Sequence, residues 1–199
     1  MLRACTICLA ICLAHDVRAG EFNPVLNIGD DAPAWQQLPG VDGKEHSLKD
    51  LAESDVVVVV FTCNTCPYAV DYEDRIIALA KNYADRKVSV VAINVNKVDG
   101  DQLADMKARA AEKGFPYPYL HDETQKIALD YGAIYTPEFF VLNKQRKVVY
   151  MGAMDNSPNA DKVTERHVEA AVEAALKGAL PKTRETVAIG CRVRFQRRR

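Results

Sequence analysis

The distribution of apolar and polar positions predicts one strand that is buried on both faces. Residues 56–61 are five valines followed by a phenylalanine, with no charge and no alternation of polar and apolar positions. Such a run is typical of a central strand in a sheet that is covered on both sides. From Tyr68 to Asp85, apolar residues recur at helical spacing instead. The pattern therefore predicts a strand that is followed closely by an amphipathic helix.

The remaining elements alternate between strands and helices before the chain closes with a hairpin and a helix. In chain order they are a small hairpin within 38–44, one helical turn at 47–51, a buried strand at 88–94, a helix at 101–113, an extended stretch at 115–120, a short helix at 124–131, a strand at 136–142, its hairpin partner at 147–151 and a helix at 164–177. Right-handed crossovers make the first strands parallel, and the hairpin adds antiparallel ones. The predicted fold class is therefore α/β, with a central mixed β-sheet and helices on both faces.

The first residues predict a cleaved secretory signal. Met1–Arg3 is a short basic start, residues 4–14 are uncharged and mostly apolar, and Ala19 is a small residue of the kind preferred before a cleavage site. This apolar run is too short to cross a bilayer, which needs about 20 residues. We predict a signal peptide at 1–19, a linker at 20–28, one domain at 29–180 and a C-terminal extension at 181–199. The protein is then exported, to the periplasm or outside the cell, with no membrane span after cleavage.

Composition and charge bear on the partners. The 199 residues are 48% apolar, which suffices for one packed domain, and the formal net charge is −1. A nearly neutral chain creates no strong long-range field, so we predict neither nucleic acid nor an anionic membrane as a partner. The arginines near the C-terminus are interpreted as a solvated tail: Arg192, Arg194, Arg197, Arg198 and Arg199.

The cysteines point to redox chemistry. Three of the six lie within the predicted signal, and three remain, namely Cys63, Cys66 and Cys191. A disulfide between Cys63 and Cys66 would close too small a loop to stabilise the fold much, so chemistry explains the pair better. Cys66 precedes Pro67, and proline suits the first position of a helix. Unpaired N–H groups and the helix dipole stabilise a thiolate at such a position.

Several short motifs resemble those of the redoxin branch of the thioredoxin-like superfamily. They are Gly29–Pro33, Leu38–Lys44, Ser47–Leu51, the valine strand, Cys66–Pro67 and, before a later strand, Thr136–Pro137. This branch includes the alkyl hydroperoxide reductase/thiol-specific antioxidant (AhpC/TSA) proteins and the periplasmic thiol–disulfide oxidoreductases. The resemblance covers residues 28–177. It implies a thioredoxin-like fold and an enzyme that exchanges disulfides with protein thiols without an organic cofactor, in a direction that the residues do not fix.

The same resemblance assigns roles to the cysteines. Cys66 takes the attacking position at the helix start, and Ala69 stands where most relatives have their second cysteine. Cys63 precedes the nucleophile and is close enough to be its resolving partner, since a disulfide needs Cα atoms only about 4.4–6.8 Å apart. The reverse assignment, with Cys63 attacking, stays open. Cys191 is either an inert packed thiol or a second resolving cysteine.

The substrate side of the site is assigned in the same way. Thr136 and Pro137 resemble the family's cis-proline motif, which implies that Thr136 offers its backbone to an extended substrate. Strand-like pairing of this kind recognises peptide main chain. Tyr68 and Glu138 are predicted to flank the site. Their alternative roles are packing on the helix surface for Tyr68 and a solvated strand end for Glu138.

Three other functions compete with disulfide exchange. Peroxiredoxins carry Pro-x-x-x-Thr-x-x-Cys, and neither Cys66 nor Cys63 has a proline and a threonine at those positions. The cysteine pair with one histidine could bind copper or zinc. However, the candidate histidines lie in segments without a metal motif, so no metal site is predicted: His46, His121 and His167. A thioredoxin-like domain can also act only as a binding platform, in which case Cys66→Ser would leave the biological activity intact.

Overall fold

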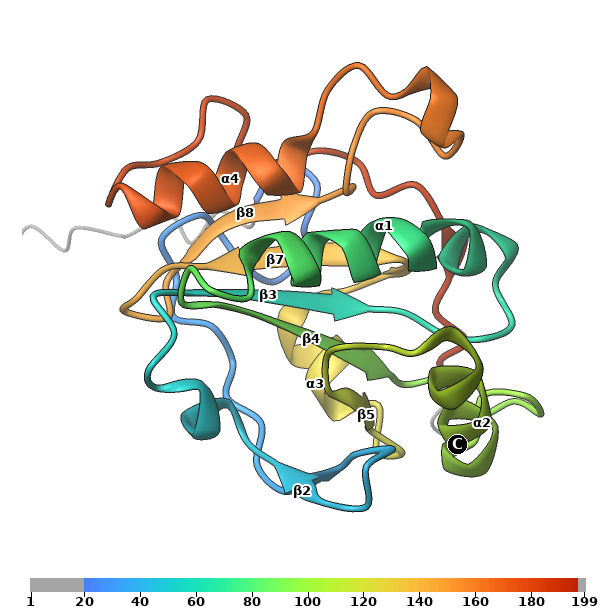
Figure 1. Ribbon diagram of the computed structural model, residues 1–199. Helices are drawn as coiled ribbons and strands as arrows, with labels where there is room; N and C mark the ends of the chain where they lie inside the picture. Colours follow the sequence, from blue (N-terminus) through green and yellow to red (C-terminus); the bar gives the residue numbers. More distant parts are fainter. Residues whose placement is uncertain (1–19, 197–199) are drawn as a thin grey trace, which may run out of the picture.

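The computed structural model describes residues 20–196, which form a five-stranded mixed sheet with helices around it (Figure 1). The strands are β3 (Val56–Phe61), β4 (Val88–Asn94), β5 (Tyr119–His121), β7 (Glu138–Leu142) and β8 (Val148–Gly152), in the spatial order β5-β4-β3-β7-β8. The first three are parallel, whereas β7 and β8 run antiparallel to their neighbours. The predicted mixed sheet is confirmed. The predicted signal peptide lies outside the described residues.

The valine run forms the central strand because both of its faces are covered. Every residue of β3 is 0% exposed. Side chains alternate between the two faces of a strand, and this divides β3 between two hydrophobic cores. One core receives Val56, Val58 and Val60, and the other receives Val57, Val59 and Phe61. Burial of a valine side chain contributes roughly 1.5–3 kcal/mol, which explains why this strand shows no polar alternation.

Helices cover both faces of the sheet, as predicted (Figure 1). The first core contains side chains of α1 (Pro67–Tyr83) and α4 (His167–Leu176). The second core contains side chains of the short helix α3 (Lys126–Tyr131). Helix α2 (Leu103–Lys113) lies beside β5 and places Met106 in the first core.

The small elements also match the pattern of the sequence. β1 (Leu38–Pro39) and β2 (Glu45–His46) pair as an antiparallel hairpin. The single turn η1 (Leu48–Leu51) follows, and the Asp50 carboxylate accepts the backbone N–H of Ser47 at 2.7 Å. A second short turn, η2 (Ala160–Lys162), precedes α4. The predicted hairpin and helical turn are therefore present.

The segment before the domain packs against the core. Residues 20–28 are predicted to be a linker, yet Leu26 is buried in the second core. The Asn23 side-chain amide donates to the Tyr131 carbonyl at 2.8 Å. These contacts anchor the segment to α3. Within residues 20–196, we find no helix long and apolar enough to cross a membrane.

The C-terminal extension returns to the sheet's C-terminal side. Its short strand β9 (Cys191–Arg192) pairs antiparallel with β6 (Tyr135–Thr136), directly before β7. The red segment of Figure 1 accordingly passes beside the start of α1. The sequence does not predict β9, because two residues have no periodicity from which a strand could be recognised.

Candidate redox site

Cys66 lies at the N-terminus of α1, where the sequence predicts it. β3 ends at Phe61, a short loop follows, and Cys66 is the N-cap residue with an extended backbone (φ −86°, ψ 121°). Pro67 occupies the start of the helix, where an N–H group is not needed. The positive end of the helix dipole therefore faces the Cys66 sulfur and favours its thiolate.

Three free thiols gather around Thr136. Cys63 and Cys66 are each 3% exposed, and Cys191 is half-buried against them. The Cys63 thiol donates to the Thr136 hydroxyl with an Sγ–Oγ1 distance of 3.4 Å. The Cys66 thiol donates to the Thr136 carbonyl with an Sγ–O distance of 3.1 Å. The structure thus brings together the predicted pair, the third cysteine and the predicted substrate-binding threonine.

Hydrogen bonds lower the pKa of Cys66 below that of a free thiol. The largest contribution comes from the Cys63 thiol, and burial opposes it by disfavouring the charged form. The Cys191 thiol and the backbone N–H groups of Ala69 and Cys191 stabilise the thiolate further. Ionisation gives up the bond from Cys66 to the Thr136 carbonyl, but several donors replace that single acceptor.

The pKa of Cys63 is raised by the same contacts. The main cause is its hydrogen bond with Cys66: once Cys66 is ionised, the single Cys63 proton, which otherwise points to the Thr136 hydroxyl, stabilises the Cys66 thiolate. Burial raises it further, the Thr136 hydroxyl acts in the opposite direction, and the negative charge of Asp101 makes a smaller contribution that raises it. The proton therefore stays on Cys63 while Cys66 carries the negative charge.

Asp101 fixes the loop between the two cysteines. Its side chain is buried, and the carboxylate accepts the Asn64 backbone N–H and the Thr65 hydroxyl, each at 2.7 Å. The Asn96 side-chain amide donates to it at 3.1 Å. The sequence predicts that the next helix begins at Asp101, but α2 begins at Leu103 and its N-cap is Gln102. Its role was missed because Asn64, its partner, lies 37 residues earlier.

The Thr136–Pro137 peptide bond is cis, as the resemblance implies. Thr136 is buried, and its strand partner is Cys191 of the same chain. The backbone predicted to bind an extended substrate is therefore covered by the C-terminal extension.

The two flanking residues have different environments. Tyr68 is 41% exposed, and its backbone N–H lowers the pKa of Cys191. Glu138 is buried, so its alternative role as a solvated strand end is wrong. The Glu138 carboxylate accepts the backbone N–H groups of Ile134 at 2.7 Å and Tyr135 at 2.9 Å. Burial raises the pKa of Glu138 to about 7 against these two hydrogen bonds. Glu138 thereby supports the backbone that leads into Thr136.

The histidines that were considered as metal ligands contact residues other than the cysteines. Among residues 20–196, no three or more histidine, cysteine, aspartate or glutamate side chains are grouped so that they could hold a metal ion. The ring of His46 bonds to Asp42 with an Nε2–Oδ1 distance of 3.0 Å. His167 stacks on Tyr150.

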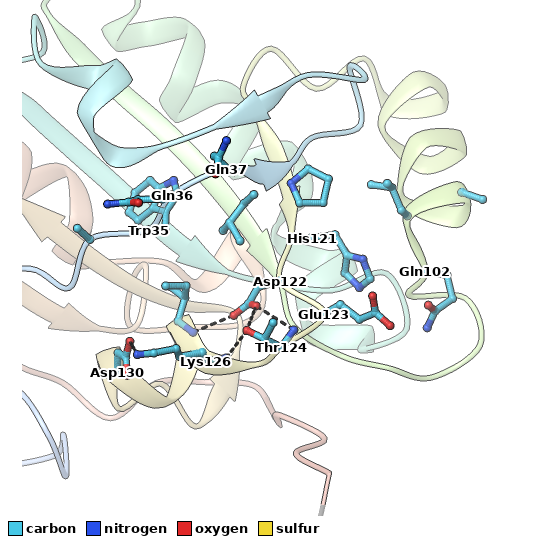
Figure 2. Close-up of a pocket in the computed structure, with 16 residues that line it drawn as sticks. Trp35, Gln36, Gln37, Gln102, His121, Asp122, Glu123, Thr124, Lys126 and Asp130 are labelled. Carbon is cyan, nitrogen blue, oxygen red and sulfur yellow. Dashed lines mark hydrogen bonds and ion pairs between the residues drawn. The ribbon is translucent and has the colours of Figure 1, made fainter.

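A separate cavity of about 810 Å³ lies beside β5 (Figure 2). It is lined by residues 34–39, the start of α2 and the loop before α3. In that loop, Asp122 accepts the backbone N–H groups of Thr124 at 3.0 Å and Ile127 at 2.8 Å, which fixes the start of α3. His121 lies in the wall, and its buried Nε2 has no hydrogen-bond partner among the described residues. None of the described cysteines lines this cavity, so thiol chemistry belongs elsewhere.

The fold and the cysteines before α1 define a redoxin of the thioredoxin-like superfamily. Residues 28–151 match the AhpC/TSA family, and the chain belongs to that family. The predicted superfamily, redoxin branch and oxidoreductase class are thereby confirmed.

Known proteins agree with this membership. An uncharacterized conserved protein from Geobacillus kaustophilus is 34% identical in sequence, with a TM-score of 0.81 over 87% of this chain and 95% of that structure. The thiol-disulfide oxidoreductase ResA of Bacillus anthracis is 27% identical over 126 residues, which are 62% of this chain and 68% of ResA. A thiol:disulfide interchange protein from Chlorobium tepidum TLS shares the fold at 23% identity, with a TM-score of 0.56 over 67% of this chain and 92% of that structure.

Proposed function

We propose that the protein is an exported thiol–disulfide oxidoreductase in which Cys66 attacks and Cys63 resolves. The observation that carries this assignment is the position of the two sulfurs: Cys66 is the N-cap residue of α1, whereas Cys63 lies in the loop before it, and both thiols contact Thr136. The pKa shifts agree with it, because the hydrogen bond between the two thiols lowers the pKa of Cys66 and raises that of Cys63. Disulfide exchange requires a thiolate that attacks and a thiol that is retained until the second step.

The reaction then has two steps. The Cys66 thiolate attacks one sulfur of a substrate disulfide, forms a mixed disulfide and releases the other substrate sulfur as a thiolate. Cys63 next loses its proton and attacks the Cys66 sulfur, so that a Cys63–Cys66 disulfide forms and the second substrate sulfur leaves as a thiolate. Two electrons pass from the cysteine pair to the substrate. The same steps in reverse oxidise a substrate dithiol.

Protein thiols and disulfides are the proposed partners. ResA, a relative at 27% identity, is named a thiol-disulfide oxidoreductase. The backbone of Thr136 already pairs with an extended strand, β9, which supports an extended peptide over a compact small molecule as its ligand. The basic and apolar composition of residues 1–19 supports export.

Trapping of mixed disulfides tests the assignment. Each variant also carries Cys191→Ser, so that the third thiol takes no part. We expect Cys63→Ser to accumulate a mixed disulfide between Cys66 and an unfolded substrate protein, and Cys66→Ser to accumulate none. Accumulation in Cys66→Ser alone would assign the attack to Cys63. If neither variant traps substrate and the parent pair does not oxidise, disulfide exchange is ruled out.

Peroxide consumption separates this function from thiol peroxidase activity. Cys63 occupies the position three residues before Cys66 where peroxiredoxins have threonine. We therefore expect the reduced protein to consume hydrogen peroxide no faster than a free thiol. Rapid consumption that is lost in Cys66→Ser would identify a thiol peroxidase instead.

A further inference from the structure

The C-terminal extension lies where a substrate peptide would bind. In β9, Cys191 pairs with Thr136 and Arg192 pairs with Tyr135, in antiparallel register. The Val193 N–H continues the contact by donating to the Ile134 carbonyl at 2.8 Å. An exposed strand edge of this kind binds extended peptides by main-chain hydrogen bonds. The chain thus supplies its own strand for the edge that the proposed function assigns to substrate.

Side chains beyond β9 hold the extension in this register. Val193 is buried in the second core. The Arg194 N–H donates to the Asn96 side-chain oxygen at 3.0 Å. Gln125 contacts the extension on both sides, because its amide nitrogen donates to the Arg194 carbonyl at 3.0 Å and its oxygen accepts the Gln196 N–H at 2.8 Å. The strand is docked, rather than merely adjacent to the site.

Gly190 brings the extension close to the site because it has no side chain. A Cβ atom at this position would collide with the carbonyl group of Thr136 and approach the nitrogen of Pro137 to 3.0 Å. Backbone atoms cannot move aside as a flexible side chain can. A larger residue at position 190 would therefore push the extension, with Cys191, away from the site without removing any cysteine from the chain.

The docked strand presents Cys191 to Cys66. Cys191 packs against the cluster of Cys63, Cys66 and Ala69, and its strand partner Thr136 accepts the Cys66 thiol with its carbonyl oxygen. Cys63 and Cys66 are almost fully buried, whereas Cys191 is half-buried. Of the three described thiols, Cys191 is therefore the one that solvent reaches most readily.

We propose that residues 188–196 are a built-in substrate strand, which presents the Cys191 thiol for disulfide exchange with Cys66. This inference rests on the proposed function and adds a second disulfide to it. Starting from oxidised protein, the Cys191 thiolate attacks the Cys66 sulfur. The Cys66–Cys191 bond forms, the Cys63–Cys66 bond breaks, and Cys63 leaves as a thiolate that takes up a proton. No net oxidation occurs in this step.

Exchange with a partner then takes place at the more accessible sulfur. A partner thiolate attacks Cys191, forms a mixed disulfide with it and releases the Cys66 thiolate. A second thiol of the partner then attacks the partner sulfur of this mixed disulfide and releases Cys191 as a thiolate. The partner dithiol becomes a disulfide and the protein is reduced by two electrons. The reverse sequence reduces a partner disulfide.

The pKa of Cys191 changes with the redox state in the direction that these reaction steps require. In the reduced protein, burial and then the Cys66 thiolate raise the pKa of Cys191 to about 11. A Cys63–Cys66 disulfide removes that thiolate, while the Tyr68 N–H and the Arg194 charge, which lower the pKa of Cys191, remain. Cys191 thus becomes a better nucleophile when its target disulfide is present.

Disulfide mapping in Cys63→Ser tests the exchange directly. The full chain is equilibrated in glutathione buffers, quenched with acid, alkylated and digested with trypsin. A Cys66–Cys191 disulfide joins the peptide 50–75 to the peptide 185–192. In this variant each of the two peptides contains a single cysteine. Because the strand is docked, we expect an effective concentration at least about tenfold higher than in Cys63→Ser/Gly190→Val. Cys63→Ser/Val187→Ala, altered at an exposed residue of the extension, should match Cys63→Ser.

Two results would overturn the inference. One is a Cys63→Ser protein that carries only glutathione on Cys66 and no bond to Cys191. The other is an equal effective concentration with valine at position 190. Oxidation of Cys63 and Cys66 in Cys191→Ser is measured alongside. If that pair oxidises but Cys66–Cys191 does not form, the proposed function survives and the built-in strand fails.

Peptide access gives an independent measurement in Cys191→Ser, where a partner can react only with the cysteine pair. If the extension occupies the peptide position, adding Gly190→Val to this variant should raise the exchange rate with a disulfide-containing unfolded protein by more than the rate with oxidised glutathione. Glutathione needs no strand edge, so it controls for a general change in thiol reactivity. Equal changes in both rates, or no change in either, contradict occupation of the Thr136 edge.

Discussion

The Asp101 carboxylate accepts the backbone N–H of Asn64 at 2.7 Å and thereby ties the loop between the redox cysteines to the segment directly before α2. It accepts the Thr65 hydroxyl as well and is completely buried. One side chain therefore positions the loop and places a negative charge beside Cys63. The raised pKa of Cys63 depends in part on that charge.

Replacing Asp101 by asparagine should weaken the anchoring of the loop and remove the negative charge beside Cys63, while both cysteines stay in place. The amide has one acceptor oxygen where the carboxylate has two, so at least one buried donor loses its partner at a cost of about 1–3 kcal/mol. We expect a lower free energy of unfolding in urea and a lower pKa of Cys63, measured by alkylation at several pH values. Asp99→Asn, at an exposed position two residues earlier, should change neither. A raised pKa of Cys63 in Asp101→Asn would contradict this account.

The pKa of Cys66 should change more when Cys63 is removed than when Cys191 is removed. The hydrogen bond from Cys63 lowers the pKa of Cys66 more than the bond from Cys191 does. We therefore expect Cys63→Ala to raise the pKa of Cys66 more than Cys191→Ala, with the double variant highest. The ultraviolet absorbance of the thiolate, followed as a function of pH, measures each value. A Cys63→Ala protein whose Cys66 titrates as in the parent would show that the helix terminus alone sets this pKa.

The amino-acid sequence was sufficient to predict the elements that are determined by residues within them or next to them. The uniform apolar run of β3 requires cover on both faces, and Pro67 marks the start of α1 next to Cys66. Gly114 and Gly132 mark the ends of two helices, because both adopt the left-handed backbone that glycine tolerates. These features decide the fold class and the position of the attacking cysteine.

Contacts between distant segments could not be predicted in the same way. Asp101 lies beside a helix start, so a local interpretation makes it a cap, although it bonds to the cysteine loop instead. Cys191 lies in a segment that is too short for periodicity, and its partner Thr136 is 55 residues earlier in the chain. Both positions depend on the folded sheet, which brings the end of β3, the end of β4 and the C-terminal extension together.

Glu138 should make stability depend on pH. Burial raises its pKa to about 7, above the value of about 4.3 expected in the unfolded chain. Below that lower value both states are protonated, and as pH rises the unfolded chain loses its proton first. The stabilising contribution of protonated Glu138 is therefore lost as pH rises through about 7, by up to about 3 kcal/mol.

Urea unfolding of Glu138→Gln at pH 5 and at pH 8 measures this contribution. The amide oxygen can still accept the two N–H groups of Ile134 and Tyr135, but it does not titrate. We expect the stability of the parent, relative to the variant, to be lower at pH 8 than at pH 5. Glu123→Gln, at an exposed position, should show no such change. A difference that grows with rising pH would mean that the two hydrogen bonds outweigh burial.

Gln125 should control how firmly the C-terminal extension is held, without altering any thiol. Its oxygen accepts the Gln196 N–H, whereas the Arg194 N–H bonds to Asn96. Its backbone is left-handed (φ 61°), so asparagine is a better replacement than alanine because it tolerates this conformation. The shorter side chain of Gln125→Asn should fail to reach Gln196. Loss of a hydrogen bond of about 1 kcal/mol predicts roughly fivefold faster amide exchange there.

Hydrogen exchange followed by NMR distinguishes local loosening from general destabilisation. Because Asn96 is unchanged, we expect the Arg194 amide to keep more of its protection than the Gln196 amide in Gln125→Asn. Gln145→Asn, at an exposed position in the turn before β8, supplies the matched control and should leave both amides unchanged. Equal acceleration at Gln196, at Arg194 and throughout β3 would mean that the variant lowers global stability. In that case Gln125 is not a specific anchor of the extension.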